Sequence, residues 1–118
     1  MIIVHLALAS DWDAAWPSGE YRVSTIGATL DEVGFIHAST DEQLAATFER
    51  FYAGVDEDLV VVLMDTELAG ESGAPVMFED AGNGELFPHI FGPIRPSFVL
   101  RADRVSVDEL AATLGSAT

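Results

Sequence analysis

The three histidines of this sequence are the side chains best suited to acid–base or ligand-binding chemistry near neutral pH. His5 lies in an apolar run, His37 stands just before Ser39 and Thr40, and His89 lies among Phe, Pro and Gly residues. A capping serine or threonine after a strand predicts a helix start, where anions bind, and a rigid Pro- and Gly-rich segment is typical of binding loops. Function is therefore expected first at His37 and His89.

Some of these residues also have an ordinary structural interpretation. A lone histidine inside an apolar run, such as His5, is commonly packed with its ring nitrogens hydrogen-bonded. Ser39 and Thr40 can serve as helix caps alone. Glu79 follows an apolar stretch: buried near a histidine it would orient the ring and raise its basicity, whereas on an edge strand it would face water. The sequence leaves these alternatives open.

The residue types that the chain lacks exclude several mechanisms. All five basic residues are arginine, and there is no lysine and no cysteine. Thiolate chemistry, Cys-ligated metals, P-loops and Schiff-base lysines are thereby excluded. The histidine spacing matches no recognised ligand pattern, so we expect no metal. Neither a GxGxxG fingerprint nor a Gly-x-Ser-x-Gly elbow is present, which argues against a Rossmann site and a hydrolase triad.

The charge balance is strongly acidic. Twenty acidic residues face five basic ones, which gives a net charge of −15 at pH 7. Nucleic acids and anionic membrane surfaces are bound by clustered Lys and Arg, so we expect neither as a partner. No apolar run reaches the ~20 residues of a membrane span, and the first residues lack the basic region of a signal peptide, which predicts a cytoplasmic protein.

An anionic ligand of such a protein needs a local cationic group. The sources that the sequence offers are its arginines, a helix N-terminus at Ser39–Thr40, and the histidines if they are protonated. If the histidines supply the charge, ligand affinity should rise as the pH falls toward ~6, near the pKa of free imidazole.

Hydrophobic periodicity and capping residues predict an α+β fold with short helices flanking a mixed or antiparallel sheet. Strands are expected at residues 2–7, 20–25, 34–38, 58–65, 76–79, 87–91 and 98–105, and helices at 10–16, 40–54, 66–70 and 106–114, with 30–32 in a loop. The β-branched run within 58–65 predicts a central strand. The length of 118 residues predicts a single domain, 1–118, with an ordered core of about 2–114 and a frayed tail at 115–118.

Two capping boxes and one apolar face define the expected helices. Thr40 with Gln43, and Ser106 with Glu109, have the spacing of a capping box. In the helix that Thr40 opens, residues 44, 48 and 51 are Leu, Phe and Phe, a spacing that predicts one apolar face.

Two motifs resemble those of a known bacterial family. They are Gly34-Phe35-Ile36-His37-Ala38-Ser39-Thr40, followed by Gln43, and Leu86-Phe87-Pro88-His89-Ile90-Phe91-Gly92-Pro93; Ile3-Val4-His5 and Trp12 agree as well. Over nearly its whole length the chain resembles the family catalogued as domain of unknown function 952. The resemblance implies a small bacterial protein to which no activity is assigned.

The motif order is also distantly similar to the ADP-ribosyltransferase-like superfamily. That similarity implies a split sheet, a small-molecule ligand and NAD as the candidate cofactor. It places His5 on the ribose-holding histidine of an early strand, His37 on the aromatic stacking position and His89 on the late catalytic position. The candidate catalytic residues are then His37, His89 and Glu79, and the candidate cofactor-binding residues are His5, Ser39, Thr40 and Phe87.

Two functions follow from these observations. One is a transferase-like domain that binds NAD or a similar nucleotide in a histidine-lined cleft. The alternative is a binding or regulatory module without catalysis, because the catalytic glutamate of many transferases has no counterpart at His89. A deep pocket in which the side chains of His37 and His89 converge within hydrogen-bond reach would favour the first. The substrate and the oligomeric state stay open.

Overall fold

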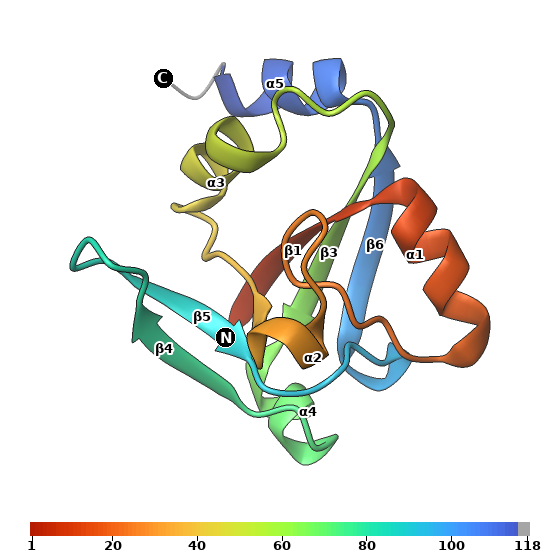
Figure 1. Ribbon diagram of the computed structural model, residues 1–118, viewed down its shortest axis with the longest axis vertical. Coiled ribbons are helices and arrows are strands. Elements are labelled where there is room, and N and C mark those ends of the chain that lie inside the picture. The colour runs from red at the N-terminus through yellow and green to blue at the C-terminus, as the bar shows by residue number, and fades with distance from the viewer. Residues whose placement is uncertain (116–118) are drawn as a thin grey trace.

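Two antiparallel three-stranded sheets form the framework of the protein in the computed structural model, which describes residues 1–115 (Figure 1). The first sheet has the order β1-β3-β6, made of β1 (Ile2–Leu8), β3 (Leu59–Asp65) and β6 (Val99–Val105). The second has the order β2-β5-β4, made of β2 (Ile36–His37), β5 (Leu86–Ile90) and β4 (Val76–Asp80). The predicted α+β class is confirmed, and every strand pairing is antiparallel.

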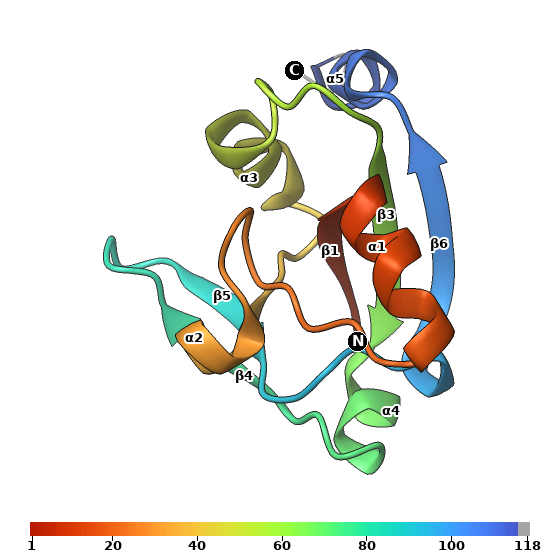
Figure 2. The same ribbon diagram turned by 45° about the vertical axis from the view of Figure 1, so that its right-hand side comes forward.

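Short helices cover and connect the sheets. They are α1 (Ala9–Ala15), η1 (Trp16–Ser18), α2 (Leu30–Val33), α3 (Leu44–Phe51), α4 (Thr66–Glu71), η2 (Pro96–Phe98) and α5 (Val107–Gly115). In both Figure 1 and Figure 2, α3 and α5 lie side by side beyond one end of the first sheet, and α1 lies along it. Within residues 1–115, no helix has the length and apolarity needed to span a bilayer.

Strand β3 is the central strand of its sheet, as its continuous apolar run predicts. Its residues alternate between two hydrophobic clusters. Val62 and Met64 belong to the cluster shared with α1 and the second sheet, whereas Leu59 packs with Phe48 of α3 and Leu110 of α5. Both faces of β3 are therefore covered, so this strand could not carry the alternating polar residues of a strand with one face in water.

The two sheets meet where the chain leaves β2. Ser39 pairs with Val4 of β1 through two backbone hydrogen bonds of 2.8 Å. The carbonyl oxygen of His37 lies 2.7 Å from Nδ1 of His5, also on β1. Residues 37–39 therefore pass from the second sheet onto the edge of the first, and this junction fixes the position of His37.

Two expectations for residues 20–34 are wrong. Residues 20–25 form no strand, only the isolated bridges of Tyr21 with Ile94 and of Val23 with Thr29. Residues 30–33 form α2 rather than a loop. Thr29 and Glu32 make a capping box whose Thr-x-x-Glu spacing is present in the sequence, and it stabilises this one-turn helix.

The boundaries of α3 also differ from the prediction. Residues 41–43 form a turn and the helix begins at Leu44, and it ends at Phe51 instead of continuing to Gly54. The side chain of Gln43 accepts the backbone N–H of Thr40 at 3.0 Å, as expected, but its amide nitrogen also donates to the carbonyl oxygen of Leu86 at 2.7 Å. Gln43 thus attaches the start of α3 to β5.

The last helix follows its capping box. Ser106 Oγ accepts the backbone N–H of Glu109 at 3.0 Å, and the Glu109 carboxylate accepts that of Ser106 at 3.4 Å. Helix α5 then runs to Gly115, so the first residue of the predicted frayed tail is helical. Residues 116–118 of that tail lie outside the described residues.

Gly70 provides a test of α4. It is an exposed residue inside the helix, and a Cβ there would meet no atom within 4 Å. Since alanine is favoured over glycine in helices, we expect Gly70→Ala to raise the free energy of unfolding by about 0.5–1 kcal/mol in urea denaturation. The matched control is Gly73→Ala, which should lower it because Gly73 has a φ of 82°. A loss of stability in Gly70→Ala would contradict the assignment of residue 70 to the interior of α4.

Candidate functional site

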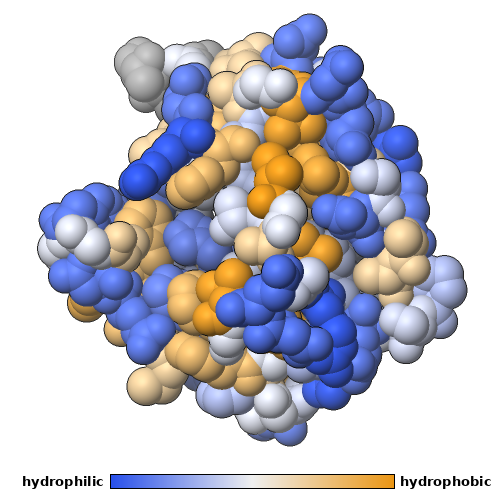
Figure 3. Space-filling view, viewed as in Figure 1, coloured by the Kyte–Doolittle hydropathy of each residue, from blue (hydrophilic) through white to orange (hydrophobic). Residues whose placement is uncertain are grey.

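A pocket of about 430 Å³ lies between the β4–β5 hairpin, α3 and the segment around α2. Figure 3 shows the hollow on the face viewed in Figure 1, between the hairpin at the left and α3 above it. His37 and His89, with Phe87, come from the second sheet, and Arg50 and Phe51 come from α3. The pocket therefore gathers residues from both predicted motifs.

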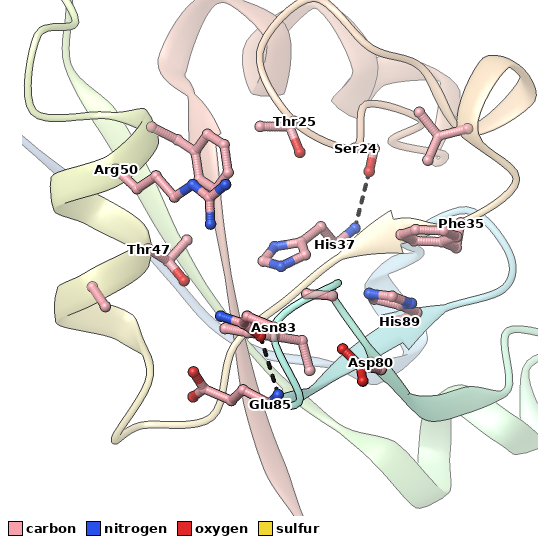
Figure 4. Close-up of a pocket in the computed structure, with 15 residues that line it drawn as sticks. Ser24, Thr25, Phe35, His37, Thr47, Arg50, Asp80, Asn83, Glu85 and His89 are labelled. Carbon is pink, nitrogen blue, oxygen red and sulfur yellow. Dashed lines mark hydrogen bonds between the residues drawn. The ribbon is translucent and has the colours of Figure 1, made fainter.

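His37 and His89 are direct partners across β2 and β5. Opposed residues of an antiparallel pair project from the same face, and both rings line the pocket with centroids 5.8 Å apart (Figure 4). The backbone N–H of His37 donates to Oγ of Ser24 at 3.0 Å, which attaches β2 to the neighbouring loop, whose residues Ser24 and Thr25 also line the pocket. The two histidines thus line one cavity, and no hydrogen bond joins their rings within residues 1–115.

Glu79 fixes the orientation of His89. One carboxylate oxygen lies 2.7 Å from Nδ1 of His89, across the diagonal between β4 and β5. A carboxylate can only accept, so Nδ1 carries the proton and the lone pair of the neutral ring is on Nε2. Phe35 stacks on the other side of the ring, with a centroid separation of 3.8 Å and an interplanar angle of 12°. The His89 side chain is 6% exposed and that of Glu79 is 46% exposed.

His37 is a neutral imidazole with free ring nitrogens. Burial, with smaller contributions from His89 and Arg50, lowers its pKa to about 4. Neither ring nitrogen has a hydrogen-bond partner among residues 1–115, whereas the ring lies 5.2 Å from that of Phe87. One nitrogen can therefore donate and the other accept toward a ligand. The pKa also removes His37 as a source of positive charge near pH 6.

His5 lies behind this site and does not line the pocket. It is 1% exposed; Nδ1 donates to the carbonyl of His37 at 2.7 Å, and Nε2 accepts from the hydroxyl of Tyr21 at 3.2 Å. Burial lowers its pKa to about 4, so it supplies no charge near pH 6 either. His5 is therefore a packed histidine with both ring nitrogens hydrogen-bonded, and its contact with the site is through the backbone carbonyl of His37.

Of the other predicted residues, Phe87 lines the pocket and Ser39 and Thr40 do not. Ser39 is buried, and its Oγ is 2.8 Å from Oγ1 of Thr47, which does reach the pocket. The backbone N–H of Thr40 is taken by Gln43. Because α3 begins four residues after Thr40, the expected helix N-terminus at Ser39–Thr40 does not exist.

Arg50 and Phe51 are pocket residues that the sequence did not single out. The predicted apolar face of α3 holds for Leu44 and Phe48, which are 7% and 1% exposed, but Phe51 is 40% exposed and faces the pocket. A large aromatic residue at the very end of an amphipathic helix, preceded by an arginine, is the available sequence signal. This signal indicates a pocket only in the folded protein, where the β4–β5 hairpin supplies the other wall.

The β4–β5 hairpin supplies the acidic wall. Asp80 and Glu85 line the pocket together with Asn83. Asp80 Oδ1 accepts the backbone N–H groups of Gly82 and Gly84 at 2.7 and 3.0 Å, which holds the turn and lowers the pKa of the carboxyl group. Within residues 1–115, no three His, Cys, Asp or Glu side chains gather as a metal site.

The comparisons with known proteins agree with the two motifs. Residues 6–102 match a family described as protein of unknown function (DUF952). The crystal structure of protein CC0527 from Caulobacter crescentus is 28% identical, with a TM-score of 0.77 over 98% of this chain and 99% of that one. Its solution NMR structure is 29% identical, with a TM-score of 0.68 over 86% of this chain and 82% of that one. Among curated proteins, none matches. Because the family model matches most of its length, this chain belongs to the DUF952 family.

Proposed function

We propose that the pocket binds NAD or a similar nucleotide and that the protein is an ADP-ribosyltransferase-like domain. The observation that carries the proposal is the convergence of His37 and His89 on one cavity, with His89 held by Glu79. The division of the strands into two sheets of three is the kind of split sheet that the similarity in motif order implies.

The dimensions and walls of the pocket suit part of a dinucleotide. Ligand sites commonly measure ~300–1,000 Å³, and about 430 Å³ lies in the lower half of that range. Phe87 and Phe51 lie beside the His37 ring, with centroids 5.2 and 6.3 Å away, and offer apolar faces to a heteroaromatic ring. One ring with its ribose fits this space, and the remainder of a dinucleotide would extend along the rim.

The two histidines have different roles in such a reaction. In transfer from NAD, the bond between ribose C1′ and the nicotinamide nitrogen breaks and an acceptor forms a new bond to C1′. Nε2 of His89 has its lone pair free and can take the acceptor's proton, because Glu79 holds the other nitrogen and stabilises the charged ring. His37 can donate from one ring nitrogen to a ribose oxygen.

The first test is ligand binding. NAD, ADP-ribose and nicotinamide should each be assayed by thermal unfolding and calorimetry at pH 7.5. Binding at about 100-fold over the dissociation constant adds ~2.7 kcal/mol to the stability. We expect His37→Ala and His89→Ala to weaken binding at least tenfold, and Glu49→Gln, on an exposed α3 residue outside the pocket, to leave it unchanged. Absence of binding by all three compounds would refute the proposal.

A binding module without turnover is the second candidate. Its support is that Glu79 is half exposed, is hydrogen-bonded to His89 and does not line the pocket, so this predicted catalytic carboxylate does not face the space that the reacting sugar would occupy. Chromatographic assay of nicotinamide release from bound NAD separates the two functions. Release that is lost in Glu79→Gln while binding persists supports the transferase, whereas binding without release supports the module.

A further inference from the structure

We propose that Arg50 is the anion-binding residue of the pocket and that it selects ligands in which a phosphate is attached next to the ring and ribose held at His37. The inference rests on the proposed function and deepens it, because it assigns a binding partner to the anionic part of the ligand, which the neutral His37 ring does not bind strongly. The chemistry that Arg50 would recognise is an oxyanion, to which a guanidinium donates in a fixed planar geometry.

Arg50 is distinguished from the other arginines by its lack of an acidic partner. The chain has 20 acidic residues and five arginines. Across residues 1–115, four of the arginines form ion pairs and Arg50 forms none. The pairs are Arg22 with Glu20 and Asp31, Arg95 with Glu20, Arg101 with Asp103, and Arg104 with Asp13 and Asp58. In so acidic a protein, an unpaired guanidinium at a cavity indicates a place kept for an external anion.

The position of Arg50 agrees with this role. It projects from the last turn of α3 over the ring of Phe51, 5.2 Å from the centroid, and Figure 4 shows the guanidinium directed into the pocket above His37. Its positive charge is near enough to contribute to the lowered pKa of His37. An oxyanion bound by Arg50 would therefore lie in the same cavity that the His37 ring lines.

The opposite wall gives the ligand a direction. Asp80 and Glu85 line the pocket from the hairpin, so the cavity has a negative side at the hairpin and a positive side at α3. An anionic group is repelled from the first and attracted to the second. A phosphate is expected at α3, with the uncharged or cationic ring of the same ligand beside His37 and Phe87, nearer the hairpin.

A stabilising role in the helix is the ordinary explanation of Arg50. A cation in the last turn interacts favourably with the helix dipole. That role accounts for a positive charge at this position, but it does not account for the direction of the side chain into the pocket. The two roles predict different results, because only anion recognition makes the effect of the substitution depend on the ligand.

The test compares ligands that differ by one phosphate. Nicotinamide riboside and its 5′-monophosphate are titrated into the wild type, Arg50→Gln, Arg50→Lys and Arg101→Gln at 50 and 500 mM salt. Arg101→Gln removes the same charge from β6, outside the pocket. We expect the wild type to bind the monophosphate at least tenfold more tightly than the riboside. Arg50→Gln should abolish that difference, Arg50→Lys should restore it in part, and high salt should reduce it.

Pyrophosphate alone is the second probe. We expect it to shift the NMR signals of the His37 ring in the wild type and in Arg101→Gln but not in Arg50→Gln. Equal binding of the riboside and the monophosphate would overturn the role of Arg50 and leave the proposed function standing. If no riboside binds but pyrophosphate acts through Arg50, the anion site stands and the nucleotide function fails. If pyrophosphate and the monophosphate act equally on the wild type and Arg50→Gln, the proposal is wrong.

Discussion

Replacement of Gly92 by alanine is expected to lower the free energy of unfolding by about 3 kcal/mol, the upper part of the range for an overpacked site. A Cβ at this position would lie 2.9 Å from Cα and Cβ of Ala74 and from the carbonyl oxygen of Gly73. Real Cβ atoms essentially never approach so closely, and none of the three atoms is the end of a flexible side chain. The backbone segments themselves must separate.

Urea denaturation at pH 7.5 measures this effect. Gly54→Ala is the matched control, because it adds the same methyl group at an exposed glycine with no atom within 4 Å and no positive φ. We expect the control to be unchanged or slightly stabilised, by up to ~1 kcal/mol. Equal stability of Gly92→Ala and the wild type would show that the two segments are not in contact.

The consequence of Gly92→Ala should extend to the pocket. Gly92 follows β5, and the preceding residue, Phe91, donates its backbone N–H to the carbonyl of Pro75 at 2.9 Å. Pushing this segment away from residues 73–75 shifts the strand that carries His89. Ligand binding should therefore weaken in the fraction of Gly92→Ala that remains folded, although no atom of Gly92 lines the cavity.

Much of the fold could be predicted because its signals are local. The apolar run of β3 requires two covered faces, and the Ser106–Glu109 box marks the start of α5. Gly92 belongs to a motif recognised in the sequence, but the reason why a glycine is needed there is its contact with Ala74, which depends on tertiary structure. Residues 20–25 fail as a strand for a similar reason: β propensity is present, but only single bridges are available to them.

The candidate site was predictable in part. His37 and His89 could be chosen from their motifs, but their direct pairing requires the register of β2 on β5. The bond from Glu79 to His89 requires the register of β4 as well, which is why the sequence left two alternatives for that carboxylate. Arg50 could not be singled out, since its distinguishing property is that it forms no ion pair with any of residues 1–115, which only the three-dimensional structure shows.

The electrostatic expectation for the pocket changes with these observations. The sequence suggested protonated histidines as a source of positive charge, but burial keeps His5 and His37 neutral down to a pH of about 4. Arginine stays charged at all these pH values. Anion affinity that depends on Arg50 should therefore show no contribution from the protonation of His5 or His37 between pH 5.5 and 8.

The stability of the protein is expected to fall by about 3 kcal/mol through His5 alone as the pH is lowered from 6.5 to 4. Burial depresses the pKa of His5 from 6.5 to about 4 in the folded state. Between these values the unfolded chain binds a proton that the folded protein does not, so acid favours unfolding. The contribution is complete above pH 6.5 and is lost as the pH falls to about 4.

The hydrogen bonds of His5 explain why its ring stays neutral. Nδ1 donates to the carbonyl of His37, so Nε2 must accept from the hydroxyl of Tyr21. Burial raises the pKa of Tyr21 far above its usual value, which keeps that hydroxyl a donor. A proton on Nε2 would turn this contact into two opposed donors unless the tyrosine reoriented. The Nδ1 bond joins β1 to the backbone of His37, and the Nε2 bond joins β1 to Tyr21, so the loss of stability loosens the junction on which the pocket is built.

Urea denaturation of the wild type and His5→Asn at pH 7.5, 6.5, 5.5 and 4.5 separates this contribution from that of His37, whose pKa is lowered in the same direction. His5→Asn should be less stable at pH 7.5, and its slope of stability against pH below 6.5 should be smaller by about 1 kcal/mol per pH unit. Tyr21→Phe, the control, removes a hydrogen bond but no group that titrates between pH 4.5 and 7.5, because the pKa of Tyr21 is raised, and it should keep the wild-type slope. NMR titration of the folded wild type supplies a measurement that needs no variant. A His5 ring that titrates near 6.5, or an unchanged slope in His5→Asn, would show that burial does not hold this histidine neutral.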